Sequence, residues 1–197
     1  MTAEQVDSDS ASGTTGGVLP TARTLGKGLA ALRIFMGVVL FANGVAKLFG
    51  FSRIEVGPYV ANLIDREATR FILQFEVFQD KAGGHQGTGI PGLRWIARLM
   101  LDNWGLFGWA VTAMELTVGA LLIVGLLTRF AALVGLGQQL FLALVYASSN
   151  RWAFEQPHEY VPLIILALVP AGRVWGLDGR ILRRRGTDPG ELRGWPF

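Results

Sequence analysis

The sequence lacks cysteine altogether and has only two histidines in 197 residues. The absence of cysteine excludes disulfides, thiolate metal ligands, covalently attached haem and a catalytic thiol. His85 and His158 both lie outside the long apolar stretches, which argues against bis-histidine haem within a helix bundle. No glycine-rich phosphate loop follows a strand pattern, and no Ser, His and Asp set indicates an activated nucleophile.

Charged residues are also scarce, at 17% of the chain, while 51% of the residues are hydrophobic. Soluble domains carry roughly 25% charged residues, so the deficit points to lipid as the main surroundings. The net charge of +3 and the basic pI of about 9.7 are compatible with nucleic-acid binding. However, the basic residues gather at the chain ends and beside the apolar stretches, where a membrane surface explains them better. No nucleic-acid partner is therefore expected.

The apolar residues concentrate in four stretches that we interpret as transmembrane helices: 29–51, 104–127, 130–147 and 160–175. At about 1.5 Å per residue, the first reaches across a hydrocarbon core of ~30 Å. Only Thr128 and Arg129 separate the second from the third, which predicts a tight helical hairpin. The fourth is the shortest and contains Pro162 and Pro170. Its helix is expected to start either at Tyr160 or within 155–159. The predicted fold class is an all-α integral membrane protein with a four-transmembrane-helix bundle.

The remaining segments divide around this membrane domain, which we place at residues 28–182. Residues 1–27 are rich in Ser, Thr, Gly and Asp and predict a disordered tail, and residues 183–197 form a basic tail. A cleaved signal peptide is the competing interpretation of the first span, but the apolar run continues to Phe51 and favours an uncleaved helix. In the long loop 52–103, the segments Pro58 to Phe78 and Ile90 to Leu101 predict amphipathic helices on the membrane surface.

Lys and Arg near the ends of the spans predict the orientation, because cytoplasmic flanks are enriched in them. They lie before or at the start of the first span, in the turn after the second, and at the end of the fourth or after it: Arg23, Lys27, Arg33, Arg129, Arg173, Arg180, Arg183, Arg184 and Arg185. The long loop holds basic residues as well, so the argument depends on the short segments. We expect a multi-pass protein of the cell membrane with both termini in the cytoplasm and the loop outside.

Polar residues inside the spans are the first candidate site. At about 100° per residue, Arg33, Gly44 and Lys47 share one stripe of the first span, and Glu115 and Gly119 share a face of the second. Side chains lean toward the N-terminus of their own helix, so Lys47 and Glu115 of antiparallel spans lean toward each other. Asn43 is placed to complete their hydrogen bonding. The pair would either fix helix register or form a substrate or proton site, and Lys47 could instead extend to the interface.

The third span adds Gln139 and Tyr146 on one face, with Gln138 off to its side. Amides within spans usually tie helices together. The candidate buried polar site is therefore Arg33, Asn43, Lys47, Glu115, Gln139 and Tyr146. A second candidate, for an anion or a proton at the outer mouth, is Arg151, Glu155, His158 and Glu159. A collar of interfacial charges around Trp152 explains the same residues, and no second cluster supports a metal site, so none is expected.

Several motifs together resemble the DoxX/DoxD membrane family over roughly residues 29–182. They are the run 103–109, Glu115-Leu116 with Gly119, the run 125–129, and the first span with Arg33, Gly37, Gly44 and Lys47-Leu48. The closing run 172–180 resembles the DoxD branch, which includes the large membrane subunit of archaeal thiosulfate:quinone oxidoreductase. The resemblance implies a four-helix membrane bundle linked to quinone or sulfur chemistry. The smaller subunit of that enzyme has no counterpart here, which leaves catalysis by this chain alone open.

Two functional hypotheses follow. The first is a membrane subunit of a quinone-linked redox system, similar to thiosulfate:quinone oxidoreductase, in which the polar faces border a site for quinone or a small sulfur oxyanion. No covalently bound cofactor is expected. The second is a membrane scaffold without catalytic activity that recruits redox or detoxification proteins. Both imply contact with the lipid bilayer and either a partner subunit or a homo-oligomer. A small-solute transporter is a weaker alternative, because no inverted repeat of broken helices is visible.

Overall fold

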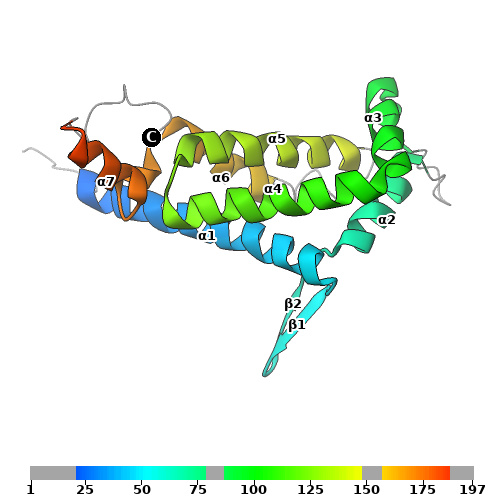
Figure 1. Ribbon diagram of the computed structural model, residues 1–197, viewed down its shortest axis with the longest axis horizontal. Coiled ribbons are helices and arrows are strands. Elements are labelled where there is room, and N and C mark those ends of the chain that lie inside the picture. Colours follow the sequence, from blue (N-terminus) through cyan, green and yellow to red (C-terminus); the bar gives the residue numbers. More distant parts are fainter. Residues whose placement is uncertain (1–20, 79–86, 148–156, 187–197) are drawn as a thin grey trace, which may run out of the picture.

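The computed structural model describes residues 21–78, 87–147 and 157–186, and within them helices dominate (Figure 1). Three helices are long and apolar enough to cross a membrane: α1 (Ala22–Phe49), α4 (Trp104–Val124) and α5 (Thr128–Tyr146). A shorter apolar helix, α6 (Pro157–Leu168), packs against α5. The protein is thus a membrane protein with several apolar helices. The expected fourth span to Trp175 is wrong in its C-terminal part, because Pro170 follows α6 and a 3-10 turn, η1 (Ala171–Arg173), replaces the helix.

The four helices form an elongated bundle, in which α1 lies along α4 and α5 lies beside both α4 and α6 (Figure 1). Its core contains the fully buried Leu122, Leu163 and Leu166, with Met36 and Leu40 from α1. Large apolar side chains also cover the outside of the bundle, where Leu106 is 69% exposed and Leu168 is 67% exposed. Exposed apolar surface on this scale would be costly in water, so it indicates contact with the hydrocarbon of a bilayer.

Glycines allow α1 and α4 to approach closely. A Cβ added at Gly119 would lie 2.6 Å from the backbone nitrogen of Phe41, and one at Gly37 would lie 2.8 Å from that of Ile123. At Gly44 the added atom would meet Leu116 at 2.9 Å. Small residues at these positions let the two backbones pack directly against each other, as is common between membrane helices.

The loop after α1 begins with a β-hairpin, which corrects the expected helix over Pro58 to Phe78. β1 (Arg53–Val56) pairs antiparallel with β2 (Tyr59–Asn62), and Val56 lies opposite Tyr59. The two-residue connection is Gly57-Pro58, and Gly57 has a φ of 58°, a conformation that glycine adopts at no steric cost. Apolar side chains at Ile54, Val56, Tyr59 and Val60 favour strands, and the helical pattern begins only afterwards.

Two helices follow in the same loop, α2 (Arg66–Phe78) and α3 (Pro91–Asp102). They pack against each other through a cluster that includes Leu73, Val77, Leu93 and Ala97. Figure 1 shows both at the end of the bundle where α4 starts, beside the projecting hairpin. The position of α3 agrees closely with the expected segment from Ile90 to Leu101. Together α2 and α3 cover one end of the four-helix bundle.

At the opposite end the chain closes with α7 (Leu177–Arg184), which lies beside the start of α1 in Figure 1. Helix α1 begins at Ala22, capped by Thr21, so residues 22–27 are helical instead of belonging to the expected tail. Asp178 of α7 accepts hydrogen bonds from the backbone N–H groups of Leu127 (2.7 Å) and Thr128 (3.0 Å). This carboxylate caps α5, because the side chain of its N-cap residue, Leu127, makes no capping hydrogen bond.

Candidate functional site

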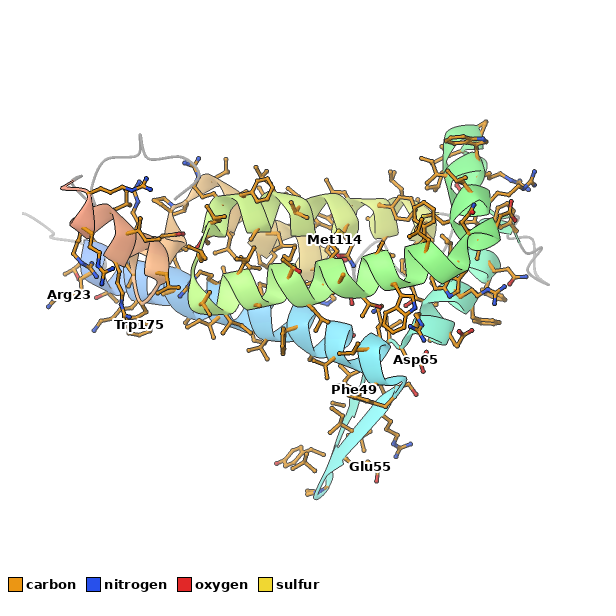
Figure 2. The ribbon with its side chains drawn as sticks, viewed as in Figure 1. Arg23, Phe49, Glu55, Asp65, Met114 and Trp175 are labelled. Atoms are coloured by element: carbon orange, nitrogen blue, oxygen red, sulfur yellow. The ribbon has the colours of Figure 1, made fainter. Side chains whose placement is uncertain are left out.

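A cavity of about 420 Å³ opens between α1, α4 and α5 beneath α2 and α3. Apolar side chains form most of its wall, including Leu40, Ile72, Ile96, Met100, Phe107, Val111, Met114, Phe141, Leu142 and Val145. Polar side chains are grouped among them: Asn43, Lys47, Thr69, Glu115, Gln138, Gln139, Tyr146 and Glu159. Figure 2 labels Met114 on the wall, about midway along α4. The cavity therefore combines a wide apolar lining with a small set of hydrogen-bonding groups, as small-molecule sites usually do.

A buried ion pair forms the polar centre of this cavity. Lys47 Nζ lies 2.9 Å from Glu115 Oε2, and the two side chains are 4% and 6% exposed. The other carboxylate oxygen of Glu115 accepts a hydrogen bond of 2.7 Å from Nε2 of Gln138. The structure thus contains the pairing of Lys47 with Glu115 that the helical faces indicated. Gln138, which the sequence placed to the side, is the amide that contacts the carboxylate.

The ion pair is also tied to the loop that follows the hairpin. Lys47 Nζ donates to the carbonyl oxygen of Ile64 at 2.9 Å, and the N–H of Ile64 donates to Oδ1 of Asn43 at 3.2 Å. The amide nitrogen of Asn43 donates to the carbonyl of Val39. The sequence predicted that Asn43 would bond to the Lys47–Glu115 pair. In the structure its side chain holds the loop at Ile64. Sequence reasoning could not find the role of Ile64, because its backbone makes both contacts.

Some polar atoms at the cavity have no hydrogen-bond partner among the residues that the structure describes. They are Nε1 of Trp104, Oε1 of Gln138 and Oε1 of Gln139. Trp104 is 9% exposed and Gln139 is 7% exposed, so neither side chain is well placed to bond to bulk water. Leaving a buried donor or acceptor without a partner costs about 1–3 kcal/mol. These atoms are therefore suited to a polar ligand inside the cavity.

The other expected members of the buried site are distributed differently. Tyr146 is buried and lines the cavity, but Arg33 lies at the opposite end of α1. Its guanidinium donates to the carbonyl of Trp175 at 3.1 Å and lies close enough to Asp178 for a charge interaction. A helical stripe shows which side a residue faces but not its depth, so the stripe grouped Arg33 with a site it does not reach.

The outer-mouth candidates are only partly described. Arg151 and Glu155 lie outside the described residues. His158 and Glu159 are in the first turn of α6, where His158 Nε2 is 3.8 Å from Glu159 Oε1. The His158 side chain is 72% exposed, whereas Glu159 reaches the cavity wall. Among the described residues, no group of three or more His, Asp or Glu side chains is placed to hold a metal ion.

Comparison with known proteins gives one family match. The model of the DoxX family matches residues 71–148, which run from α2 through α3 and α4 to the end of α5. The chain is similar to the DoxX family over that segment, which contains Glu115, Gln138, Gln139 and Tyr146 of the cavity. No curated protein and no solved structure matches the chain.

Proposed function

We propose that this chain is the membrane subunit of a quinone-linked redox system and that its cavity holds the quinone ring. The observation that carries the proposal is a buried Lys47–Glu115 pair at the polar centre of an apolar cavity. A quinone has the matching character, with a flat apolar ring, two carbonyl acceptors and an apolar tail. The volume of about 420 Å³ lies within the range of about 300–1,000 Å³ that is usual for small-molecule sites.

Donors for the quinone carbonyls are available at the cavity. The indole N–H of Trp104 has no acceptor among the described residues. The ammonium group of Lys47 has three donors, of which contacts to Glu115 and Ile64 account for two. The amide of Gln139 is a further candidate. The apolar walls formed by Phe107 and Phe141 provide surfaces for the ring.

Glu115 suits proton transfer in such a reaction. Reduction of a quinone to a quinol takes up two electrons and two protons. A carboxylate held by Lys47 and Gln138 inside the membrane can accept a proton and pass it to a neighbouring oxygen. The electrons would come from a small reductant such as thiosulfate, as the resemblance to the DoxD branch suggests, or from a partner subunit.

Binding of decylubiquinone to the purified full-length chain in lipid nanodiscs tests the proposal directly. We expect saturable binding by equilibrium dialysis, with affinity reduced at least about tenfold in Trp104→Phe and Lys47→Met, because each removes one donor worth about 1.4 kcal/mol or more. Trp95→Phe is the matched control, since Trp95 is 67% exposed on α3. Absence of saturable binding, or equal affinity in all variants, would refute the quinone site. Quinone reduction with thiosulfate, measured with and without co-purifying chains, then tests catalysis.

A scaffold that recruits redox or detoxification proteins is the second candidate. It is favoured by the exposed apolar side chains of the hairpin, where Val56 is 68% exposed and Tyr59 is 77% exposed. Such a surface suits either a protein partner or a second copy of the chain. In both proposals the hairpin faces the outside of the cell membrane and both termini lie in the cytoplasm. Quinone binding by the isolated chain, together with no stable partner on co-purification, would exclude the scaffold.

A further inference from the structure

A second cavity, of about 910 Å³, lies at the other end of the bundle between the start of α1, η1 and α7. Five basic side chains line it: Arg23, Lys27, Arg173, Arg180 and Arg183. No acidic residue is among its described lining residues. Figure 2 labels Arg23 and Trp175 at this end, with the nitrogen-tipped side chains of neighbouring residues around them. We call this cavity the basic cleft.

Asp178 lies in the first turn of α7 but does not neutralise the basic cleft. Its side chain is fully buried and accepts hydrogen bonds from the backbone N–H groups of Leu127 and Thr128. Its charge also faces Arg33, which is itself fully buried and does not line the cleft. The charge of Asp178 is therefore directed into the bundle. Arg23, Lys27, Arg180 and Arg183 remain exposed around the opening.

The position of the basic cleft along the bundle corresponds to the surface of a membrane. Helix α1 has 28 residues. At about 1.5 Å per residue it is about 42 Å long, which exceeds the ~30 Å hydrocarbon core. Arg23 and Lys27 lie in its first two turns, where the excess length of the helix suits the lipid headgroup region. Trp175, which is 63% exposed, and Leu177 line the same cleft and suit the interface, where tryptophan is enriched.

The backbone at the mouth of the cleft is held in an unusual conformation. Trp175 has a φ of 53°, which is uncommon for a residue with a side chain. The guanidinium of Arg33 binds the carbonyl oxygen of Trp175 from inside the bundle at 3.1 Å. Strained backbone persists where the surrounding structure enforces it, often at binding sites. The buried arginine therefore helps to set the shape of a cleft whose exposed arginines face outward.

We propose that the basic cleft binds a phosphate group at the membrane surface, and that the headgroup of an anionic phospholipid supplies it. Several guanidinium groups around one opening can bind phosphate oxygens in pairs, and a cleft between helix ends gives them a common focus. Basic pockets at the cytoplasmic ends of membrane helices commonly bind lipid headgroups in this way. Free phosphate has the same chemistry and is the other source. The site is separate from the quinone cavity and does not depend on its function.

Native mass spectrometry of the full-length chain in detergent tests the inference with phosphatidylglycerol, phosphatidylcholine and inorganic phosphate as probes. We expect phosphatidylglycerol to bind at least about tenfold more tightly than phosphatidylcholine, since each basic residue near a surface strengthens the attraction to anionic lipid. The triple variant Arg23→Gln, Lys27→Gln, Arg180→Gln should lose this preference. The matched control, Arg70→Gln, Arg94→Gln, Arg98→Gln, removes three exposed charges from α2 and α3 and should keep it.

The arms of this experiment separate the two sources of phosphate. Competition between inorganic phosphate and phosphatidylglycerol, together with a preference for phosphatidylglycerol over phosphatidylcholine, supports the lipid headgroup as the occupant. Binding of inorganic phosphate with no preference between the two lipids would overturn the lipid assignment and give the site to a soluble anion. Equal binding of the two lipids with no phosphate binding would overturn the proposal, as would equal losses in the triple variant and its control. A thermal melt in detergent shows whether each variant is folded. If the triple variant fails to fold, Arg180→Gln alone against Arg94→Gln provides the same comparison.

Discussion

Lys47 and Glu115 lie 2.9 Å apart on α1 and α4, with both side chains almost completely removed from solvent. Breaking a buried pair leaves one charge without a partner and costs about 3–5 kcal/mol. We expect Lys47→Met and Glu115→Leu each to lower thermal stability in detergent by an amount of this order. The double variant should regain part of the loss. Recovery should be incomplete, because the carbonyl of Ile64 also loses its donor. Strictly additive losses in this cycle would show that the interaction between Lys47 and Glu115 does not contribute to stability.

The two neighbouring glutamines should behave differently when each is replaced by leucine. Gln138 donates to Glu115 at 2.7 Å, so Gln138→Leu should cost about 1.5–3 kcal/mol, as expected for a hydrogen bond to a charged group. Gln139 is buried, but its Oε1 has no partner among the described residues, so Gln139→Leu should change stability little. Thermal unfolding of both variants in the same detergent makes the comparison. A larger loss for Gln139→Leu would contradict this assignment.

Close packing of α1 against α4 gives a prediction with a built-in control. The added Cβ of Gly119→Ala would lie 2.6 Å from the backbone nitrogen of Phe41, so the helices must separate, at a cost of about 1–3 kcal/mol. A Cβ at Gly137, on an exposed position of α5, meets nothing within 4 Å. Gly137→Ala should therefore leave the melting temperature unchanged or raise it, because alanine favours helix. Equal effects of the two substitutions would argue against the close approach.

Asp178 should be required for the junction between α4 and α5. Asp178→Ala leaves the N–H groups of Leu127 and Thr128 without their acceptor, and each loss costs about 1–3 kcal/mol. Asp102→Ala, at an exposed position where α3 ends, is the control and should have little effect. Hydrogen exchange of the first turn of α5 is the most direct measurement, and unchanged protection there in Asp178→Ala would disprove the capping role.

The natural absence of cysteine allows the proposed orientation to be tested with single cysteines. Tyr59→Cys places a thiol on the exposed hairpin, and Arg184→Cys places one at the exposed end of α7. In intact cells, a thiol reagent that cannot cross membranes should label the Tyr59→Cys variant but not the Arg184→Cys variant. Labelling at 184 should require permeabilised cells. The reverse pattern would place both termini outside.

The sequence predicted the long helices well because their apolar runs match the thickness of a bilayer. It also predicted the pairing of Lys47 with Glu115, since helical periodicity determines which faces meet. It failed where a contact depends on depth or on the backbone. Arg33 shares the stripe of Lys47 but lies at the other end of α1. The expected helix over Pro58 to Phe78 was wrong in its first part, because Gly57-Pro58 forms the turn of a hairpin and α2 begins only at Arg66.

The capping of α5 by Asp178 also orders events during synthesis. Residue 178 leaves the ribosome after the whole α4–α5 hairpin, so the first turn of α5 has no side-chain cap while the hairpin enters the membrane. The junction is completed only when α7 arrives, and the same movement brings Arg180 and Arg183 beside Arg23 and Lys27. A ribosome-bound or truncated chain that ends before α7 should therefore have a loosened α4–α5 turn and no assembled basic cleft.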